Sequence, residues 1–361
     1  MIKHPYKEIR DMAATIIADV FQLFWRPFSV EEDPLGQYAK QDRALVDEFM
    51  NELFETLPSL REARKTESKE DHSVYVSMSK SVLTLVRIVA TSSRITPILP
   101  YLIQLVPEMF YMQDDDDQEL QKFATGALEL LFQNNFPPEM LGEIIELFRT
   151  LLTSSSWHLR SKSLPVLQIF LFRNLFSIDE QSWKEVMDIL IKALLDSQLE
   201  VRTMASNTIS GLVRCSQRGS IDYLMKRFSE LLATPFMRRN KRNGNTSTTS
   251  SPTPSRTSTP SGFTESEAIL RRHAGVSGVA ALIQAFPYGG EPGAIPKWMP
   301  DALISLVPFI SDPIPISTTA KKTFLDFRRT HQETWVIDKL VFTEEQLDIL
   351  SDLLVSPSYY A

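Results

Sequence analysis

The sequence predicts an all-α fold, built as an α-solenoid of HEAT/armadillo-like helical repeats. Three observations support this prediction. Only 12 of 361 residues are glycine, and most of the chain shows helical rather than strand-like spacing of its apolar residues. The hydrophobic fraction is 43%, which is enough to bury a sizeable core. One helical pattern also recurs about every 40 residues, which is the period of HEAT and armadillo repeats.

The recurring pattern is an aliphatic residue, often followed by Arg, then a small residue four positions later and apolar residues at about eight and eleven. The four-residue offset places the small residue on the same helix face as the aliphatic one, where it lets a partner helix approach closely. The copies are Ile9-Ala13-Ile17-Val20, Leu120-Ala124-Leu128-Leu131, Leu159-Ser163-Leu167-Phe170, Val201-Ala205-Ile209-Leu212, Leu270-Ala274-Gly278-Ala281 and Ile316-Ala320-Phe324-Phe327.

The spacing of the copies indicates two helices per repeat. The gaps between the copies at 120, 159, 201, 270 and 316 are 39, 42, 69 and 46 residues, and the long gap contains a polar insert of roughly 30 residues. The segment 196–202 is predicted to be the turn between two paired helices. The stretch from 9 to 120 is less regular. A bundle of unrelated helices is the alternative, and the recurrence across most of the chain favours the solenoid.

Overall composition excludes several classes of protein. The net charge is −7 and no long basic face is present, which argues against direct, sequence-specific nucleic-acid binding. A single cysteine, Cys215, excludes a disulfide framework, suits a reducing compartment and is expected in the core. The N-terminus lacks the apolar segment of a secretory signal, and prolines interrupt the most apolar stretch, 95–112, so no membrane association is expected.

The insert divides the chain into three predicted parts: repeats over 1–234, an insert over 235–264 and a C-terminal module over 265–361. The insert is nearly free of apolar residues and is predicted to be disordered. Its basic cluster indicates nuclear import or an anionic partner, or else only a solvated loop flank. Three residues before prolines are possible phosphorylation sites. The cluster is Arg238, Arg239, Lys241 and Arg242, and the phosphorylation sites are Ser251, Thr253 and Thr259.

No catalytic constellation is found, so the chain is predicted not to be an enzyme and to require no metal or cofactor. It has no glycine-rich phosphate loop, HExxH or GxSxG motif, and its five histidines are far apart in sequence. His158 and His273 are expected to pack or cap helices. The charged stretches 61–71 and 114–117 are interpreted as solvated, the second also complementing a helix dipole.

The last helix is predicted to begin at a capping box formed by Thr343 and Gln346. Leu347, Leu350 and Leu354 give it an apolar stripe, and Pro357 prevents it from continuing. Residues 355–361 are therefore expected to leave the body of the protein, with a reach of up to about 23 Å.

The chain ends in Tyr359, Tyr360 and Ala361. Tyrosine offers a large apolar area with a hydrogen-bonding tip, which suits an interface hot spot, and a terminal carboxylate can be bound by a lysine or by backbone N–H groups. The residues alone leave two possibilities open, namely docking on a partner and folding back on the chain's own last repeat.

This ending resembles the hydrophobic-Tyr-any motif of proteasome activators. A wider resemblance is to the giant HEAT-repeat proteasome activators (the family of proteasome activator complex subunit four, or bleomycin-sensitivity family). It is carried by residues 272–276, Trp298-Met299-Pro300, Lys321-Lys322-Thr323, 327–331, Phe342-Thr343 and 353–361, and upstream by 157–160 and 199–205. Family members are several times longer, so the chain is interpreted as a C-terminal fragment.

The resemblance implies a partner and a mechanism. The tail would enter a pocket of the twenty-S proteasome core α-ring, where the Ala361 carboxylate meets a lysine and Tyr360 presses on the turn that positions the gate. It also implies ATP- and ubiquitin-independent degradation, acetylated histones as possible partners, a link to DNA repair, a location in nucleus and cytoplasm, and inositol phosphate as a possible ligand. The alternative is a HEAT-repeat scaffold or nuclear transport adaptor with an incidental tail.

Overall fold

The computed structural model describes residues 4, 6–24, 37–63, 69–92, 95–216, 219–235, 264–287 and 295–354. Within these ranges the protein consists of fifteen α-helices and three short 3-10 helices, with no strand, so the predicted all-α fold is confirmed. The chain divides into two units, Met1–Trp183 and Lys184–Ala361. The predicted boundaries of the insert stay a prediction, because 236–263 lie outside the described residues.

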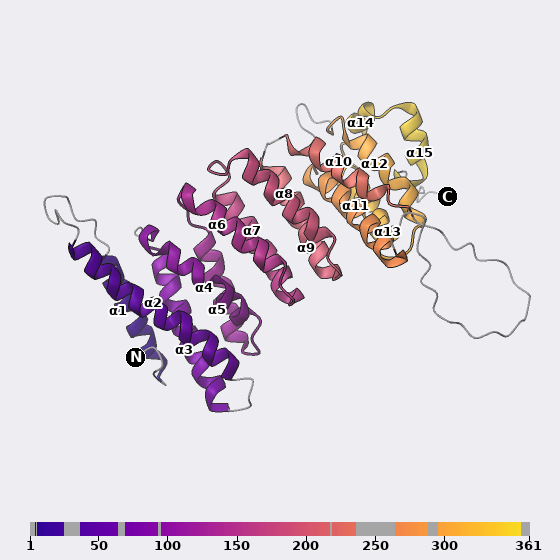
Figure 1. Cartoon of the computed structure of the whole chain (residues 1–361). Coiled ribbons are helices and arrows are strands. Elements are labelled where there is room, and N and C mark those ends of the chain that lie inside the picture. Colours follow the sequence, from indigo (N-terminus) through magenta and orange to yellow (C-terminus); the bar gives the residue numbers. More distant parts are fainter. Residues whose placement is uncertain are drawn as a thin grey trace, which may run out of the picture. The chain divides into compact units, whose positions relative to one another are not determined.

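In the first unit, the helices form two layers (Figure 1). The odd-numbered helices α1, α3, α5 and α7 pack side by side in sequence, and so do the even-numbered α2, α4 and α6. Consecutive helices pack as antiparallel pairs, which is the arrangement of a helical solenoid. The elements are α1 (Lys7–Phe24), α2 (Gln37–Ala63), α3 (Lys69–Ala90), η2 (Thr96–Ile98), α4 (Leu99–Gln113), α5 (Gln118–Phe132), α6 (Pro138–Leu152) and α7 (Trp157–Arg173).

The second unit repeats this arrangement. Helices α9, α11 and α13 lie side by side, while α15 packs on α12 and α13. Helices α10 and α11 pack tightly together although the insert separates them in sequence. After α8 (Glu180–Leu194), which crosses the division between the units, the elements are α9 (Leu199–Ser216), α10 (Ser220–Leu232), α11 (Glu265–Ala285), α12 (Met299–Leu306), η3 (Val307–Ser311), α13 (Ile316–Thr330), α14 (Trp335–Asp338), η4 (Lys339–Val341) and α15 (Glu344–Leu354).

The repeat pattern read from the sequence forms the core of the odd-numbered helices. In the copies that begin at Leu120, Leu159, Val201 and Ile316, all four positions are at most 4% exposed. The seventh copy, which the sequence analysis missed, is in α3. Its four residues are Tyr75, Ser79, Leu83 and Val86, all fully buried. Its first position holds the aromatic residue Tyr75, whereas the pattern was defined by an aliphatic residue there.

The arginine that follows the first position stabilises the turn before its helix. Arg10, Arg160 and Arg202 each donate Nη1–H to the carbonyl oxygen six residues earlier, at 2.8, 2.7 and 2.7 Å. The turn predicted at 196–202 is confirmed over 196–198, since α8 ends at Leu194, but 199–202 already form the first turn of α9, which begins at Leu199. The arginine therefore recurs because it satisfies a backbone carbonyl group in the segment before its helix.

Helix α1 carries an exposed apolar stripe. Ile9, Met12 and Ile16 are 39%, 64% and 53% exposed, while Ala13, Ala14 and Ala18 face the neighbouring helices and are buried. The three exposed residues follow helical spacing and share one face of α1. The helix is therefore apolar on two sides.

Three interpretations of single residues or stretches were wrong. Cys215 is exposed, because the buried face of α9 passes through its neighbours Val213 and Ser216. The stretch 61–71 is not merely solvated, since the Arg61 side chain is only 17% exposed and pairs with Glu108. In the acidic run, Asp115 is 1% exposed rather than solvated, whereas Asp117 caps α5 by accepting from Leu120 N at 2.7 Å, as expected for an acidic group at a helix N-terminus.

One described helix segment, His72–Ala90, has the length and apolar composition of a membrane span. Of this window, 61% is buried inside the protein. Helix α3 lies between α1 and α5 in its layer, so its apolar character is accounted for by the solenoid core.

Candidate functional site

The residues predicted to bind a partner, Tyr359, Tyr360 and Ala361, lie outside the described residues. The same is true of the basic cluster and the phosphorylation sites, Arg238, Arg239, Lys241, Arg242, Ser251, Thr253 and Thr259. The structure does describe the helix from which the tail leaves, α15, and the module that holds it.

Helix α15 begins at the predicted capping box. Gln346 N donates to Thr343 Oγ1 at 3.2 Å, and Thr343 N donates to Gln346 Oε1 at 3.0 Å. The two bonds satisfy donors that the first turn of a helix would otherwise leave without partners, so they fix where α15 starts.

The inner face of α15 packs on the rest of the module. Leu350 is fully buried, Leu347 is half-buried, and the outer residue Ile349 is 46% exposed. Gln346 also donates Nε2–H to Asp301 Oδ1 in α12 at 2.8 Å. Helix α15 is therefore held at its first turn by polar contacts and at its middle by apolar packing, and residues 355–361 follow its end.

A series of buried hydrogen bonds connects the three helices α9, α11 and α13. Arg202 Nε in α9 donates to His273 Nδ1 in α11 at 3.0 Å. Because Nδ1 accepts, Nε2 carries the proton and lies 3.0 Å from Thr319 Oγ1 in α13. Burial, and secondly the Arg202 charge, lower the pKa of His273 to about 4, so the imidazole is neutral at pH 7. The expectation that His273 packs between helices is correct.

A second buried cluster fixes α14. Asp338 is fully buried and accepts from Ile295 N at 3.1 Å, and its other oxygen lies 3.0 Å from His331 Nδ1 and close to Thr334 Oγ1. A buried carboxylate is stable only when its oxygens are hydrogen-bonded, as they are here. The chain between α13 and α15 therefore has a defined path although it is short and irregular.

A third contact joins α11 to the segment before α13. Arg272 Nη1 lies 3.0 Å from Asp312 Oδ2, and its guanidinium lies over the Phe309 ring at 4.8 Å from the centroid. The Asp312 side chain is fully buried. Together the three polar clusters connect α9, α11, α13 and α14, the elements that precede α15 in this module. Among the described residues no group of three or more metal-ligating side chains occurs.

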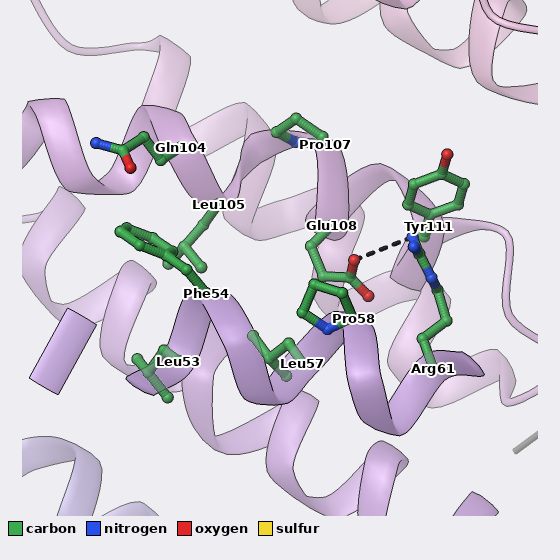
Figure 2. A pocket seen from close by; sticks show the side chains of 10 residues that line it. All are labelled: Leu53, Phe54, Leu57, Pro58, Arg61, Gln104, Leu105, Pro107, Glu108 and Tyr111. Carbon is green, nitrogen blue, oxygen red and sulfur yellow. Dashed lines mark ion pairs between the residues drawn. The ribbon is translucent and has the colours of Figure 1, made fainter. Parts of the chain in front are cut away.

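The first unit contains a groove that the sequence analysis did not find (Figure 2). It has a volume of about 450 Å³ and lies between α2 and α4. Arg61 Nη1 pairs with Glu108 Oε2 at 3.0 Å, and Tyr75 donates to Glu108 Oε1 at 3.0 Å. The Arg61 guanidinium also stacks on Tyr111, 3.8 Å from the ring centroid. Arg61 and Glu108 are 47 residues apart, so no local spacing pointed to their pairing.

Comparison with known proteins places the C-terminal module in a family. Residues 269–361 match the family model described as "Proteasome activator complex subunit 4-like, C-terminal". This range contains nearly all of α11 and every element up to α15, together with the tail.

The resemblance to individual proteins extends over the whole chain. Proteasome activator complex subunit 4B of Danio rerio is 31% identical over 365 residues, which cover 99% of this chain and 19% of that protein. Proteasome activator complex subunit 4 of Homo sapiens is 30% identical over 373 residues, with the same coverage. Proteasome activator BLM10 of Saccharomyces cerevisiae is 21% identical over 377 residues, or 99% of this chain and 16% of that protein. The chain thus spans about one fifth of the length of these relatives, and it belongs to the family of proteasome activator complex subunit 4.

Proposed function

We propose that the chain is a non-catalytic regulator that binds the proteasome core particle through Tyr359, Tyr360 and Ala361 and promotes opening of its gate. The observation that carries the proposal is the hydrophobic-Tyr-any ending, which lies in the range matched by the family model. The relatives' names as proteasome activators support the general role.

The proposed mechanism follows from the chemistry of these three residues. Tyr359 supplies apolar area, Tyr360 adds an aromatic ring with a hydroxyl tip, and the Ala361 carboxylate pairs with a lysine in a pocket between α-ring subunits. Binding opens the gate to the extent that the tail has a higher affinity for the open state than for the closed one. The packing of α15 on the module fixes the position at which the tail begins. This lowers the conformational entropy that is lost when the tail docks.

Further features of the family resemblance belong to the same proposal. They are ATP- and ubiquitin-independent degradation, acetylated histones as partners, a link to DNA repair, inositol phosphate as a ligand, and residence in nucleus and cytoplasm. The basic cluster around Arg238 and Lys241 fits nuclear import, because clustered cationic side chains are the feature that import signals share.

A HEAT-repeat scaffold or nuclear transport adaptor is the competing function. In that case the solenoid surface would bind other proteins, and the tail would contribute nothing. The groove beside Arg61 is a described surface feature that suits such a role, since most of the residues that line it are apolar and the Arg61–Glu108 pair lies at one end.

Peptide hydrolysis by isolated core particle separates these functions. The full chain is expected to stimulate hydrolysis of a fluorogenic peptide, and Tyr360→Ala or deletion of Ala361 is expected to abolish the stimulation. A matched control is Tyr6→Ala, which removes a 67% exposed tyrosine from the other end of the chain and is expected to keep full stimulation. Equal stimulation by wild type and Tyr360→Ala would exclude tail docking, and no stimulation by either protein would favour the scaffold.

A further inference from the structure

A second groove in the first unit lies between α5 and α7, and we call it the α5–α7 groove. Its volume of about 350 Å³ is within the range of ligand-binding pockets, about 300–1,000 Å³. Four of its lining residues are spaced three or four positions apart in α5, so they share one face of that helix. The residues used below are Gln113 at the end of α4, Lys122, Thr125, Gly126 and Glu129 of α5, and Lys162 of α7.

Gly126 gives the α5–α7 groove its depth. A Cβ atom added at Gly126 would have nothing within 4 Å, so this glycine is not required for the close approach of a neighbouring helix. A glycine in the interior of a helix lowers its stability, and here it leaves open the space that a side chain would fill. Every other copy of the repeat carries a side chain at this register, six residues after its first position, namely Thr15, Ser81, Pro165, Asn207, Val276 and Lys322.

The amide oxygen of Gln113 is a buried acceptor in the lining of the groove. Gln113 is 8% exposed, and its Nε2 donates to Thr125 Oγ1 at 2.9 Å. Thr125 donates its own proton to Gln121 O at 2.9 Å, which fixes the orientation of the Gln113 amide. Among the described residues, Gln113 Oε1 has no hydrogen-bond partner. Because buried polar groups are normally hydrogen-bonded, this oxygen indicates a ligand that supplies an N–H donor.

The α5 side of the groove carries opposite charges at its two ends. Lys122 and Glu129 are both exposed, and neither forms an ion pair with a described residue. They are seven residues apart, which is about 10 Å along the helix axis. The charge of Lys162 is already balanced, because its Nζ lies 3.1 Å from Asp114 Oδ1 and donates to Gln113 O at 2.7 Å. One end of the groove therefore attracts an anionic group and the other a cationic group.

An extended polypeptide segment fits these features. Three residues of extended chain span about 10 Å, which is the separation of Lys122 and Glu129. An acidic side chain can then lie beside Lys122 and a basic one beside Glu129. A main-chain N–H group between them supplies the donor that Gln113 Oε1 needs. A polyanion does not fit, because the Glu129 carboxylate repels it.

We infer that the α5–α7 groove binds an extended segment of a partner protein in which an acidic and a basic residue stand three positions apart. This inference goes beyond the proposed function, because the groove is separate from the tail residues and its ligand is not the core particle. Complementary charges give such a site its specificity, so that segments with two like charges bind more weakly.

The test is fluorescence anisotropy of a labelled glycine–serine peptide that carries one glutamate and one lysine three positions apart, titrated with the full chain. Wild type is expected to bind it saturably in the micromolar range. Gly126→Gln places a side chain in the groove and is expected to weaken binding at least tenfold. Gly142→Gln is the matched control, since Gly142 is exposed in α6 and an added Cβ there also meets nothing within 4 Å. It is expected to bind within twofold of wild type.

A charge reversal at the surface gives a second readout. Glu129→Lys makes both ends of the α5 side cationic, so this variant is expected to prefer a peptide with two glutamates at the same spacing over the mixed peptide. Circular dichroism and melting temperatures are measured first, so that only folded variants are compared.

The outcomes separate this inference from tail docking. No saturable binding by wild type, equal binding by Gly126→Gln, or an unchanged preference in Glu129→Lys would each overturn it. Tyr360→Ala is expected to bind the peptide like wild type although it no longer stimulates the core particle. Weaker peptide binding by Tyr360→Ala would assign the peptide to the tail and would also overturn the inference.

Discussion

Two glycines in α11 show how single residues determine the packing of the C-terminal module. A Cβ atom added to Gly278 would lie 2.4 Å from the Phe228 ring in α10, and one added to Gly275 would lie 2.9 Å from Leu232 N. Phe228 is fully buried and has no room to move away. The repeat pattern assigned the close helix approach in this copy to Ala274 and placed Gly278 at one of its apolar positions. It did not identify the partner, because α10 lies on the far side of the insert.

Gly278→Ala is therefore expected to destabilise the protein by about 1–3 kcal/mol, since overpacking outweighs the gain in helix propensity. Chemical denaturation monitored by circular dichroism measures the change. The control is Gly142→Ala in the interior of α6, where an added Cβ meets nothing within 4 Å, and a gain of about 0.5–1 kcal/mol is expected. A Gly278→Ala protein as stable as wild type would contradict the close α10–α11 contact.

His273 makes the stability of the same module depend on pH. Its pKa is lowered to about 4 in the folded state, mainly by burial, against 6.5 for an unperturbed histidine. Between these values the unfolded chain binds more protons than the folded one, so stability falls as pH decreases from 6.5 to 4. The fall attributable to His273 is expected to be about 2–3 kcal/mol.

The prediction is checked with His273→Gln, whose amide keeps an acceptor for Arg202 and a donor for Thr319 but does not titrate. The free energy of unfolding of this variant is expected to depend less steeply on pH between 6.5 and 4 than that of wild type. Identical slopes would show that His273 is not the buried neutral group described here.

At the scale of the secondary-structure element, the sequence predicted best those features that depend on residues close together in the chain. The capping box of Thr343 and Gln346 and the start of the turn at 196–202 depend on residues a few positions apart, and both were predicted correctly, although the predicted turn runs four residues into α9. The buried positions of α5, α7, α9 and α13 follow from periodicity alone. Tertiary contacts decided the rest. Arg61 pairs with Glu108 across two helices, and Asp338 brings Ile295, from before α12, together with His331 and Thr334 of the turn after α13.

The tail itself could be predicted only from its composition and from the resemblance. Sequence reasoning found Tyr359, Tyr360 and Ala361 but missed the exposed residues that precede α15. Val336, Ile337 and Leu340 look like core residues in sequence, because an irregular segment of α14 and η4 has no single period from which their exposure could be read.

The first turn of α15 can be destabilised by a substitution that leaves the tail residues unchanged. Thr343→Ala removes the N-cap and is expected to cost about 1 kcal/mol of local stability. Amide hydrogen exchange of α15 should then be several-fold faster, with exchange in α9 and α13 unchanged. Thr264→Ala, which removes the equivalent capping box of α11, is the control and should leave α15 protected. Unchanged exchange in α15 after Thr343→Ala would mean that apolar packing alone holds this helix.

At the scale of the whole molecule, two features tie the chain to its longer relatives. It matches them over 99% of its own length but only 19% of theirs. Its α1 presents Ile9, Met12 and Ile16 to solvent on a face suited to stacking against another repeat. The C-terminal module has its own buried polar clusters, which connect α9, α11, α13 and α14.

Site-specific photo-crosslinking tests tail docking most directly. A benzophenone amino acid is placed at Ser358, next to Tyr359, in the full chain, and the mixture with purified core particle is irradiated. Docking predicts crosslinks to α-ring subunits that disappear when Tyr360→Ala is added. Crosslinks confined to the chain's own last repeats, equally strong with and without core particle, would contradict the account.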